Sequence, residues 1–282
     1  MQRYIIQIEH YTLKEKAFGD DGVRRNKSGV QSFLIDLDGV LYVGGNPIPG
    51  VRECLEKMDE MGCSNRFVSN STRRCRDSVA LRLKGLGYDI PANRIFTPSL
   101  KAIDIMKSSG RDRCFLLTAG DVFRDFEKAG IHIADENVDY IVVGDAGNDF
   151  TFNRLNQALR LILDGAEILA LEMDRYWMEP EGLVMSTGPF VAALEYASGK
   201  KAELMGKPSP EFFQMALSDM EVGPEEAAMV GDDILTDVKG AQEMGMQGIL
   251  VKTGKYHDDL AASSGVVPDL VLESLASLAE NI

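Results

Sequence analysis

Two aspartates two positions apart, Asp36 and Asp38, end an apolar run that begins at Phe33. An ionised carboxylate is costly to bury unless a cation or hydrogen-bond donors compensate it, and neighbouring carboxylates repel each other. A metal ion beside the pair would relieve both costs, and open α/β sheets bind ligands at this end of their strands. The pair therefore predicts metal-assisted chemistry, with an acidic turn completed by Gly39 as the alternative.

Three later stretches carry polar residues with matching chemistry. They are Phe67–Thr72 with Ser69 and Asn70, Gly206–Pro208 with Lys207 at its centre, and Met229–Asp233 followed by Asp237. Together with Asp36 and Asp38, these stretches resemble, in order, the four motifs of the haloacid dehalogenase superfamily of aspartyl-phosphate hydrolases. The resemblance covers about residues 31–282. The four-part order is much more specific than any one motif.

The resemblance implies that Asp36 is a nucleophile and Asp38 an acid and base. A carboxylate is ionised at neutral pH, so it needs no base before it attacks phosphorus in line. Asp38 would give a proton to the leaving oxygen and later take one from the hydrolytic water. Residues two apart in a strand point to the same side, which suits this pairing.

Asp232 completes the expected metal site. It follows an apolar strand, and Gly231 lets the backbone approach closely. Hard oxygen ligands next to a substrate phosphate indicate Mg²⁺. By the family pattern, the ligands are the side chains of Asp36 and Asp232 and the main-chain carbonyl of Asp38.

Two further acids, Asp233 and Asp237, are expected behind these ligands, with Asp237 orienting them. The alternative for both is the acidity that favours a helix N-terminus, which needs no metal. A similar stretch, Gly144–Asp149, also follows a strand, but it lies in the middle of the chain, and we predict a structural turn there.

Ser69 and the backbone amide of Asn70 match the family motif that holds the phosphate. Their alternative role is to cap the next helix. Lys207 is expected to neutralise Asp36 and the transferred phosphoryl group. Gly206 and Pro208 fix the backbone around it, which distinguishes Lys207 from an ordinary surface lysine.

A narrower resemblance, to the phospholysine phosphohistidine inorganic pyrophosphate phosphatase group, rests on Gly188–Ala197, Gly206–Phe213 and Val251–Lys255. Members of that group carry Ser where this chain has Asp38. The leading hypothesis is a Mg²⁺-dependent phosphatase for a small phosphorylated metabolite. Alternatives are an inorganic pyrophosphate or N-phosphate hydrolase, and a non-catalytic regulatory protein on the same fold.

Short strands alternate with helical patterns along most of the chain, which predicts an α/β fold with a doubly wound parallel sheet and helices on both faces. After Asp38, Val40–Gly45 is typical of a tight hairpin with Gly44 and Gly45 as its turn. The chain after Pro268 is expected to end in a helix.

The spacing of the motifs locates a second domain. Asp36 and Ser69 are 33 positions apart and Lys207 and Asp232 are 25 apart, whereas 138 positions separate Ser69 from Lys207. Each short interval fits one βα unit, so the long one contains an insertion. We predict an α/β cap at 108–200, a core at 28–107 and 201–282, and an N-terminal extension at 1–27 with no assigned function.

The cap is expected to choose the substrate, because the core residues contact only the phosphoryl group and metal. Arg175, Tyr176 and Trp177 combine charge and aromatic rings after a strand, and they are expected to line the entrance. The alternative is a surface turn.

Composition limits the partners. The net charge of −14 argues against nucleic acid, since such binding needs Lys and Arg to neutralise phosphates. No apolar run reaches the roughly 18 residues of a membrane span. The cysteines, without C-x-x-C spacing or a preceding secretory signal, favour free thiols and a cytoplasmic location. These cysteines are Cys54, Cys63, Cys75 and Cys114. The sequence leaves open whether the protein forms a homodimer.

Overall fold

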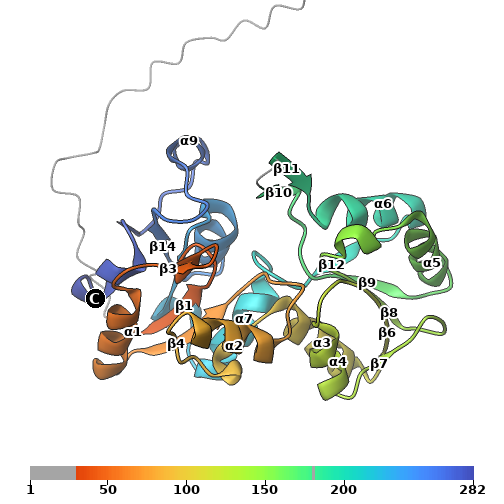
Figure 1. Cartoon of the computed structure of the whole chain (residues 1–282), viewed down its shortest axis with the longest axis horizontal. Coiled ribbons are helices and arrows are strands. Elements are labelled where there is room, and N and C mark those ends of the chain that lie inside the picture. Colours follow the sequence, from red (N-terminus) through yellow and green to blue (C-terminus); the bar gives the residue numbers. More distant parts are fainter. Residues whose placement is uncertain (1–29, 180–181) are drawn as a thin grey trace, which may run out of the picture.

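A computed structural model describes residues 30–179 and 182–282. The expected extension at residues 1–27 lies outside the described part. Figure 1 shows two α/β units side by side: the first combines the early and the late parts of the chain, and the second is formed by the middle. A chain that leaves the first unit and returns to it is the arrangement that the motif spacing predicts.

The first unit contains a six-stranded parallel sheet, which confirms the predicted fold class. Strand β1 lies near its centre and is buried along its whole length, as the apolar run predicts. Its neighbours are strands β13 and β4, both parallel to it. The sheet order is β15 (Leu270–Leu272), β14 (Gln247–Val251), β13 (Ala227–Gly231), β1 (Ser32–Asp36), β4 (Ser64–Val68) and β5 (Ile95–Phe96).

Helices cover both faces of this sheet. Alternate residues of β1 face opposite sides: Phe33 and Ile35 pack with one apolar cluster, and Leu34 packs with another. The first cluster includes α1 (Val51–Glu60), α2 (Arg76–Gly85) and the 3₁₀ turn η5 (Leu275–Glu280). The second includes α7 (Pro210–Met220) and α8 (Gly240–Glu243). Shorter elements are η1 (Ala92–Arg94), η3 (Pro224–Glu226), the π-helical η4 (Ile234–Lys239) and α9 (Asp258–Ser263).

The second unit is a five-stranded parallel sheet, again between two layers of helices. One face packs against α3 (Pro98–Ser109) and α4 (Phe123–Lys128), and the other against α5 (Phe152–Leu163) and α6 (Gly188–Ser198). The sheet order is β12 (Ala202–Leu204), β9 (Glu167–Ala170), β8 (Tyr140–Val143), β6 (Arg113–Leu117) and β7 (His132–Ile133). The turn η2 (Gly147–Asp149) precedes α5.

The expected domain boundaries at 107/108 and 200/201 fall inside this second unit. Helix α3 buries Ala102, Ile103 and Met106 in the apolar cluster of the second sheet, and β12 pairs with β9 at its edge. Both elements therefore pack with the insertion, although Leu100 of α3 also packs against the apolar cluster of the first sheet. We propose boundaries near Pro98 and Met205 on this basis.

The C-terminal segment differs from its expected helix. After Pro268 the chain first forms β15, which pairs with β14 at the sheet edge, and only then the 3₁₀ turn η5. Leu270 and Leu272 are buried and Val271 is exposed, which is the alternation of a strand. The sheet edge thus overrides the local helical preference.

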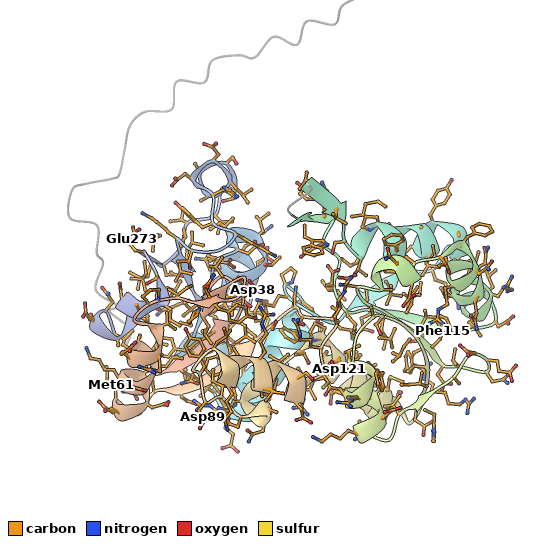
Figure 2. All side chains as sticks on the ribbon, viewed as in Figure 1. Asp38, Met61, Asp89, Phe115, Asp121 and Glu273 are labelled. Atoms are coloured by element: carbon orange, nitrogen blue, oxygen red, sulfur yellow. The ribbon has the colours of Figure 1, made fainter. Side chains whose placement is uncertain are left out.

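Two hairpins flank the space between the units. β2 (Tyr42–Val43) and β3 (Asn46–Pro47) form the predicted hairpin around Gly44 and Gly45. β10 (Tyr176–Glu179) and β11 (Gly182–Met185) form a second hairpin from the inserted unit. Asp38 of the first unit and Asp121 of the second lie on the sides of the units that face each other (Figure 2). Within the described ranges, every helix is too short or too polar to cross a membrane.

Candidate active site

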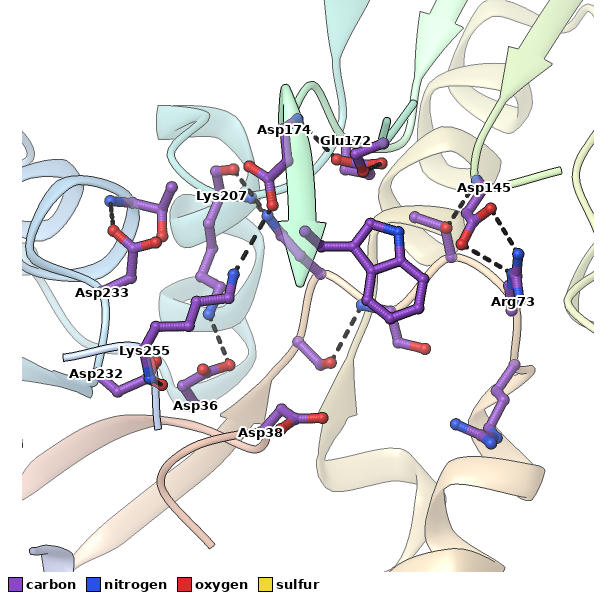
Figure 3. A pocket seen from close by; sticks show the side chains of 18 of the residues that line it. Asp36, Asp38, Arg73, Asp145, Glu172, Asp174, Lys207, Asp232, Asp233 and Lys255 are labelled. Atoms are coloured by element: carbon purple, nitrogen blue, oxygen red, sulfur yellow. Dashed lines mark hydrogen bonds and ion pairs between the residues drawn. The ribbon is translucent and has the colours of Figure 1, made fainter. Parts of the chain in front are cut away.

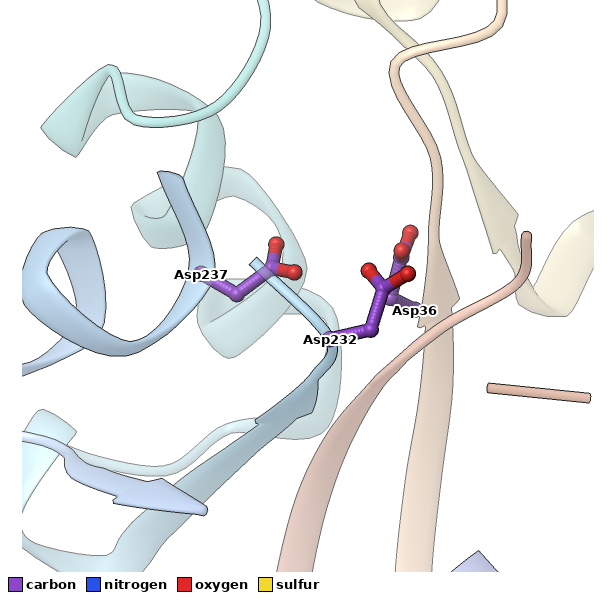
Figure 4. Close-up of side chains that lie close together, drawn as sticks. All are labelled: Asp36, Asp232 and Asp237. Atoms are coloured by element: carbon purple, nitrogen blue, oxygen red, sulfur yellow. The ribbon is translucent and has the colours of Figure 1, made fainter. Parts of the chain in front are cut away.

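The carboxyl ends of three adjacent strands bring the predicted residues together. Asp36 ends β1, Ser69 follows β4, and Asp232 follows β13. β1 lies between the other two strands, so residues from distant motifs meet at one sheet edge. Asp36, Asp232 and Asp237 each offer a carboxylate oxygen within 4.8 Å of the others (Figure 4).

Lys207 is the buried cation of this cluster. Its Nζ atom lies 2.7 Å from Asp36 Oδ1 and 2.7 Å from Asp237 Oδ1. Burial by itself would lower the pKa of Lys207, but the charges of Asp237 and Asp36 outweigh it and raise the pKa above its usual value. Lys207 therefore stays protonated beside the Asp36 carboxylate.

Asn70 fixes the backbone that carries Lys207. Its side-chain amide donates to the Lys207 carbonyl at 3.0 Å and accepts from the Lys207 N–H at 2.8 Å. Gly206 permits this approach, because a Cβ atom there would lie 2.6 Å from Asn70 Oδ1. The Asn70 side chain is thus engaged by protein, whereas no acceptor among the described residues takes its backbone N–H.

Asp232 is held by two loops that meet at one of its carboxylate oxygens. The Lys255 N–H donates to Asp232 Oδ2 at 2.6 Å. Gly39 and Gly254, both with positive φ, pack against the same carboxylate: a Cβ atom would lie 1.8 Å from Asp232 Oδ2 at Gly39 and 2.0 Å at Gly254. The side chain of Thr253 donates to the Gly39 carbonyl at 2.5 Å and joins the two loops.

The donor set fits a magnesium ion. Burial, followed by the charges of Asp36 and Asp237, raises the pKa of Asp232 to about 8. The protein alone therefore supplies too little positive charge for this group of carboxylates. A divalent cation among oxygen ligands supplies such charge. Because Lys207 and the Asp233 N–H take the oxygens of Asp237, at 2.7 and 3.2 Å, Asp237 suits a positioning role. Asp36 and Asp232 are the other two carboxylates of the cluster that could hold the ion.

Asp233 has the helix-capping role that the sequence left open. Its Oδ1 atom accepts from the N–H groups of Leu235 at 2.9 Å and Thr236 at 3.0 Å, at the start of η4. These bonds satisfy donors that have no partner inside the helix. The π-helical turn that follows places Asp237 next to Lys207.

Asp38 faces an open cavity, while Asp36 lies at its base (Figure 3). Desolvation first, and the Asp36 charge second, raise the pKa of Asp38 above its usual value. A carboxyl group with a raised pKa holds its proton more readily, which suits an acid at the edge of the site.

The cavity has a volume of about 840 Å³ and separates the two units. Trp177 and Asp174 of the inserted unit line this cavity as well, and Figure 3 shows Asp174. Arg175 and Tyr176 instead line an adjoining cavity of about 510 Å³, which Trp177 and Lys255 also border. The three expected specificity residues therefore divide between two cavities.

Several residues of the site carry no clear signal in the sequence. Lys255 belongs to the Val251–Lys255 stretch, whose resemblance gave it no role, yet its Nζ atom lies 3.8 Å from Asp174 of the other unit. Arg73 pairs with Asp145 at 2.8 Å. Asp145 lies in the predicted turn, so that turn also joins the two units. Arg74 and Arg82 line the cavity as well.

Two family models match the chain. The model described as haloacid dehalogenase-like hydrolase matches residues 33–132, and that of HAD-hydrolase-like proteins matches residues 204–278. Between them they contain the residues gathered around Asp36.

Curated relatives are similar over nearly their whole length. Haloacid dehalogenase-like hydrolase domain-containing protein 2 of Mus musculus is 39% identical over 256 residues, 91% of this chain and 97% of the relative. Phospholysine phosphohistidine inorganic pyrophosphate phosphatase of Homo sapiens is 36% identical over 255 residues, 88% of this chain and 93% of the relative.

Solved structures share the arrangement of the two units. The 4-nitrophenylphosphatase of Thermotoga maritima has a TM-score of 0.83 and 32% identity, and covers 89% of this chain and 97% of its own. The glycerol phosphate phosphatase of Mycobacterium tuberculosis, solved in complex with magnesium, has a TM-score of 0.77 and 25% identity, and covers 88% of this chain and 76% of its own.

Proposed function

Because this chain belongs to the haloacid dehalogenase-like hydrolase family and is a phosphatase, we propose that it hydrolyses a small phosphorylated metabolite with Mg²⁺ as cofactor, through an aspartyl-phosphate intermediate. The observation that carries this proposal is the position of Asp36, which lies between the buried cation of Lys207 and the carboxylate of Asp232 and borders the cavity.

In the first step, an Asp36 oxygen forms a bond to phosphorus while the bond from phosphorus to the leaving oxygen breaks. Asp38 gives its proton to that leaving oxygen. Lys207 reduces the repulsion between the Asp36 carboxylate and the phosphoryl oxygens, since it lies 2.7 Å from Asp36. The Asn70 N–H and the Ser69 hydroxyl are the proposed donors to those oxygens.

In the second step, water attacks the phosphorus of the aspartyl-phosphate. Asp38, now ionised, takes a proton from this water, and the bond between phosphorus and Asp36 breaks. Inorganic phosphate leaves and Asp36 is regenerated. The side chains of Asp36 and Asp232 and the Asp38 carbonyl would hold Mg²⁺, which when bound would supply positive charge for the buried acids and the phosphoryl group.

A second candidate is the hydrolysis of pyrophosphate or N-phosphates, which the name of the human relative describes for that protein. Asp38 favours a phosphomonoester, because an alkoxide leaving group needs a proton more than a phosphate leaving group does. A non-catalytic role would be favoured by loss of Asp36, Asp38 or Lys207, and all three are present.

The direct test measures phosphate release from p-nitrophenyl phosphate, a set of small phosphomonoesters and pyrophosphate. Each is assayed after chelation with EDTA and again with excess Mg²⁺. We expect hydrolysis of monoesters that stops on chelation and returns with Mg²⁺. Full activity after exhaustive chelation would contradict the cofactor assignment, and pyrophosphate as the preferred substrate would favour the second candidate.

A further inference from the structure

Two arginines line the cavity on the same side as Asp38. Arg74 lies in the loop before α2, and Arg82 lies in the last turns of that helix. Both charges act on Asp38 and on Tyr42 of the β2–β3 hairpin, where they lower pKa values that desolvation raises. The two guanidinium groups therefore lie within electrostatic range of the group that we assign to protonate the leaving oxygen.

Neither arginine is held in an ion pair, although both lie within electrostatic range of Asp38. Among the described residues, no carboxylate forms an ion pair with Arg74 or Arg82, whereas neighbouring Arg73 is paired with Asp145. Arg82 donates to the Gly44 carbonyl at 2.6 Å, and its guanidinium lies 4.6 Å from the centre of the Tyr42 ring. These contacts fix its position without cancelling its charge. In a chain of net charge −14, two cations without an ion-pair partner supply positive charge on the side of the cavity where Asp38 lies.

The buried lysine of the site does not supply free positive charge for the leaving group. Lys207 also lines the cavity, but it is buried and already engaged by Asp36 and Asp237, among the phosphoryl-transfer residues. Positive charge on the leaving-group side therefore comes from the arginines and from Lys255, which has Asp174 as a partner at 3.8 Å.

We propose that Arg74 and Arg82 form a second anion-binding position, which takes a carboxylate or a second phosphate on the leaving group. The preferred substrate is then a small phosphomonoester with a further anionic group. This inference rests on the proposed function, because the role of Asp38 as the acid indicates the side of the cavity on which the leaving group lies. The planar guanidinium group suits either anion, because it can donate two parallel hydrogen bonds.

Two matched substrate pairs test the proposal. 3-Phosphoglycerate differs from glycerol 3-phosphate by a carboxylate in place of a hydroxymethyl group. Propane-1,3-diol bisphosphate differs from its monophosphate by a second phosphate. The protein should have a higher kcat/KM for the anionic member of at least one pair, by about tenfold for one charged hydrogen bond. The pair that shows the preference identifies the anion.

Arg74→Gln should reduce the ratio of kcat/KM between the anionic and the neutral member of the pair to near one. The substitution removes the charge of an exposed side chain that makes no contact needed for folding. Arg74→Lys should retain part of the preference. Arg160→Gln, on an exposed position of α5 outside the cavity, is the matched control and should leave the ratio unchanged. Equal preference for both members in the unaltered protein, or an Arg74→Gln ratio equal to that of the control, would overturn the proposal.

A binding measurement separates this inference from the proposed reaction. The Asp36→Asn protein, with or without Arg74→Gln, is titrated with both members of each pair by calorimetry. Tighter binding of the anionic member that is lost with Arg74→Gln supports the subsite even where turnover is absent. Turnover of monoesters without such a difference would retain the phosphatase and remove the subsite.

Discussion

The Lys207 ammonium group lies 2.7 Å from the Asp36 carboxylate, although 171 positions separate the two residues in the chain. Asp36 ends the central strand and Lys207 precedes α7 on one face of the same sheet. The pair joins the beginning of the core to the part that follows the insertion. Folding of both parts is therefore required before the charge of Asp36 is balanced.

Asp36→Asn should abolish hydrolysis of p-nitrophenyl phosphate while the fold is retained. The substitution removes the nucleophile with little change in shape, and removal of a nucleophile costs at least roughly 10³-fold in kcat. Lys207 keeps Asp237 as its partner at 2.7 Å, so it is not left as an unpaired buried charge. Circular dichroism checks the fold, and the exposed Asp89→Asn variant is the control. Activity near that of Asp89→Asn would exclude the covalent mechanism.

Asn70→Ala should lower both stability and kcat. It removes the two hydrogen bonds that hold the main chain at Lys207. At about 0.5–1.5 kcal/mol for each bond, the free energy of unfolding should fall by about 1–3 kcal/mol. Urea denaturation measures this, with Asn153→Ala on the exposed face of α5 as the control. A loss of kcat without any loss of stability would show that Asn70 acts on substrate rather than through Lys207.

Gly254→Ala should weaken Mg²⁺ binding, and Gly44→Ala should not. Both glycines have φ of +60°, so an alanine costs about 1–2 kcal/mol of backbone strain at either position. Only at Gly254 would the new Cβ displace the Asp232 carboxylate, since nothing lies within 4 Å of it at Gly44. The Mg²⁺ concentration for half-maximal activity, measured alongside thermal stability, distinguishes the two effects. The same metal dependence in both variants would count against the role of Asp232.

Trp177→Ala should reduce kcat/KM for p-nitrophenyl phosphate by about tenfold and affect acetyl phosphate much less. The indole lines the cavity and can stack on an aromatic leaving group, a contact worth about 0.5–1.5 kcal/mol beyond its buried area. Arg175→Ala and Tyr176→Ala, which alter the adjoining cavity, should change only substrates large enough to reach it. Equal losses on both substrates would remove Trp177 from substrate selection.

The sequence by itself determined the strand ends on which the site is built. Asp36 and Asp232 each follow apolar runs, and such runs become buried parallel strands whose carboxyl ends meet at one edge. The four motifs and the long interval after Ser69 gave the family, the fold class and the presence of an insertion. These features depend on local residue types and on spacing along the chain, which a sequence contains directly.

The tertiary structure decided which groups each side chain meets. Asp233 caps η4 while Asp237 pairs with Lys207, although the two acids are only four positions apart and have similar sequence surroundings. α3 and β12 pack with the inserted unit because their apolar residues face its sheet, which no local pattern specifies. The unpaired charges of Arg74 and Arg82 likewise follow from what surrounds them in space. Contacts between distant segments depend on packing, and packing is a property of the whole fold.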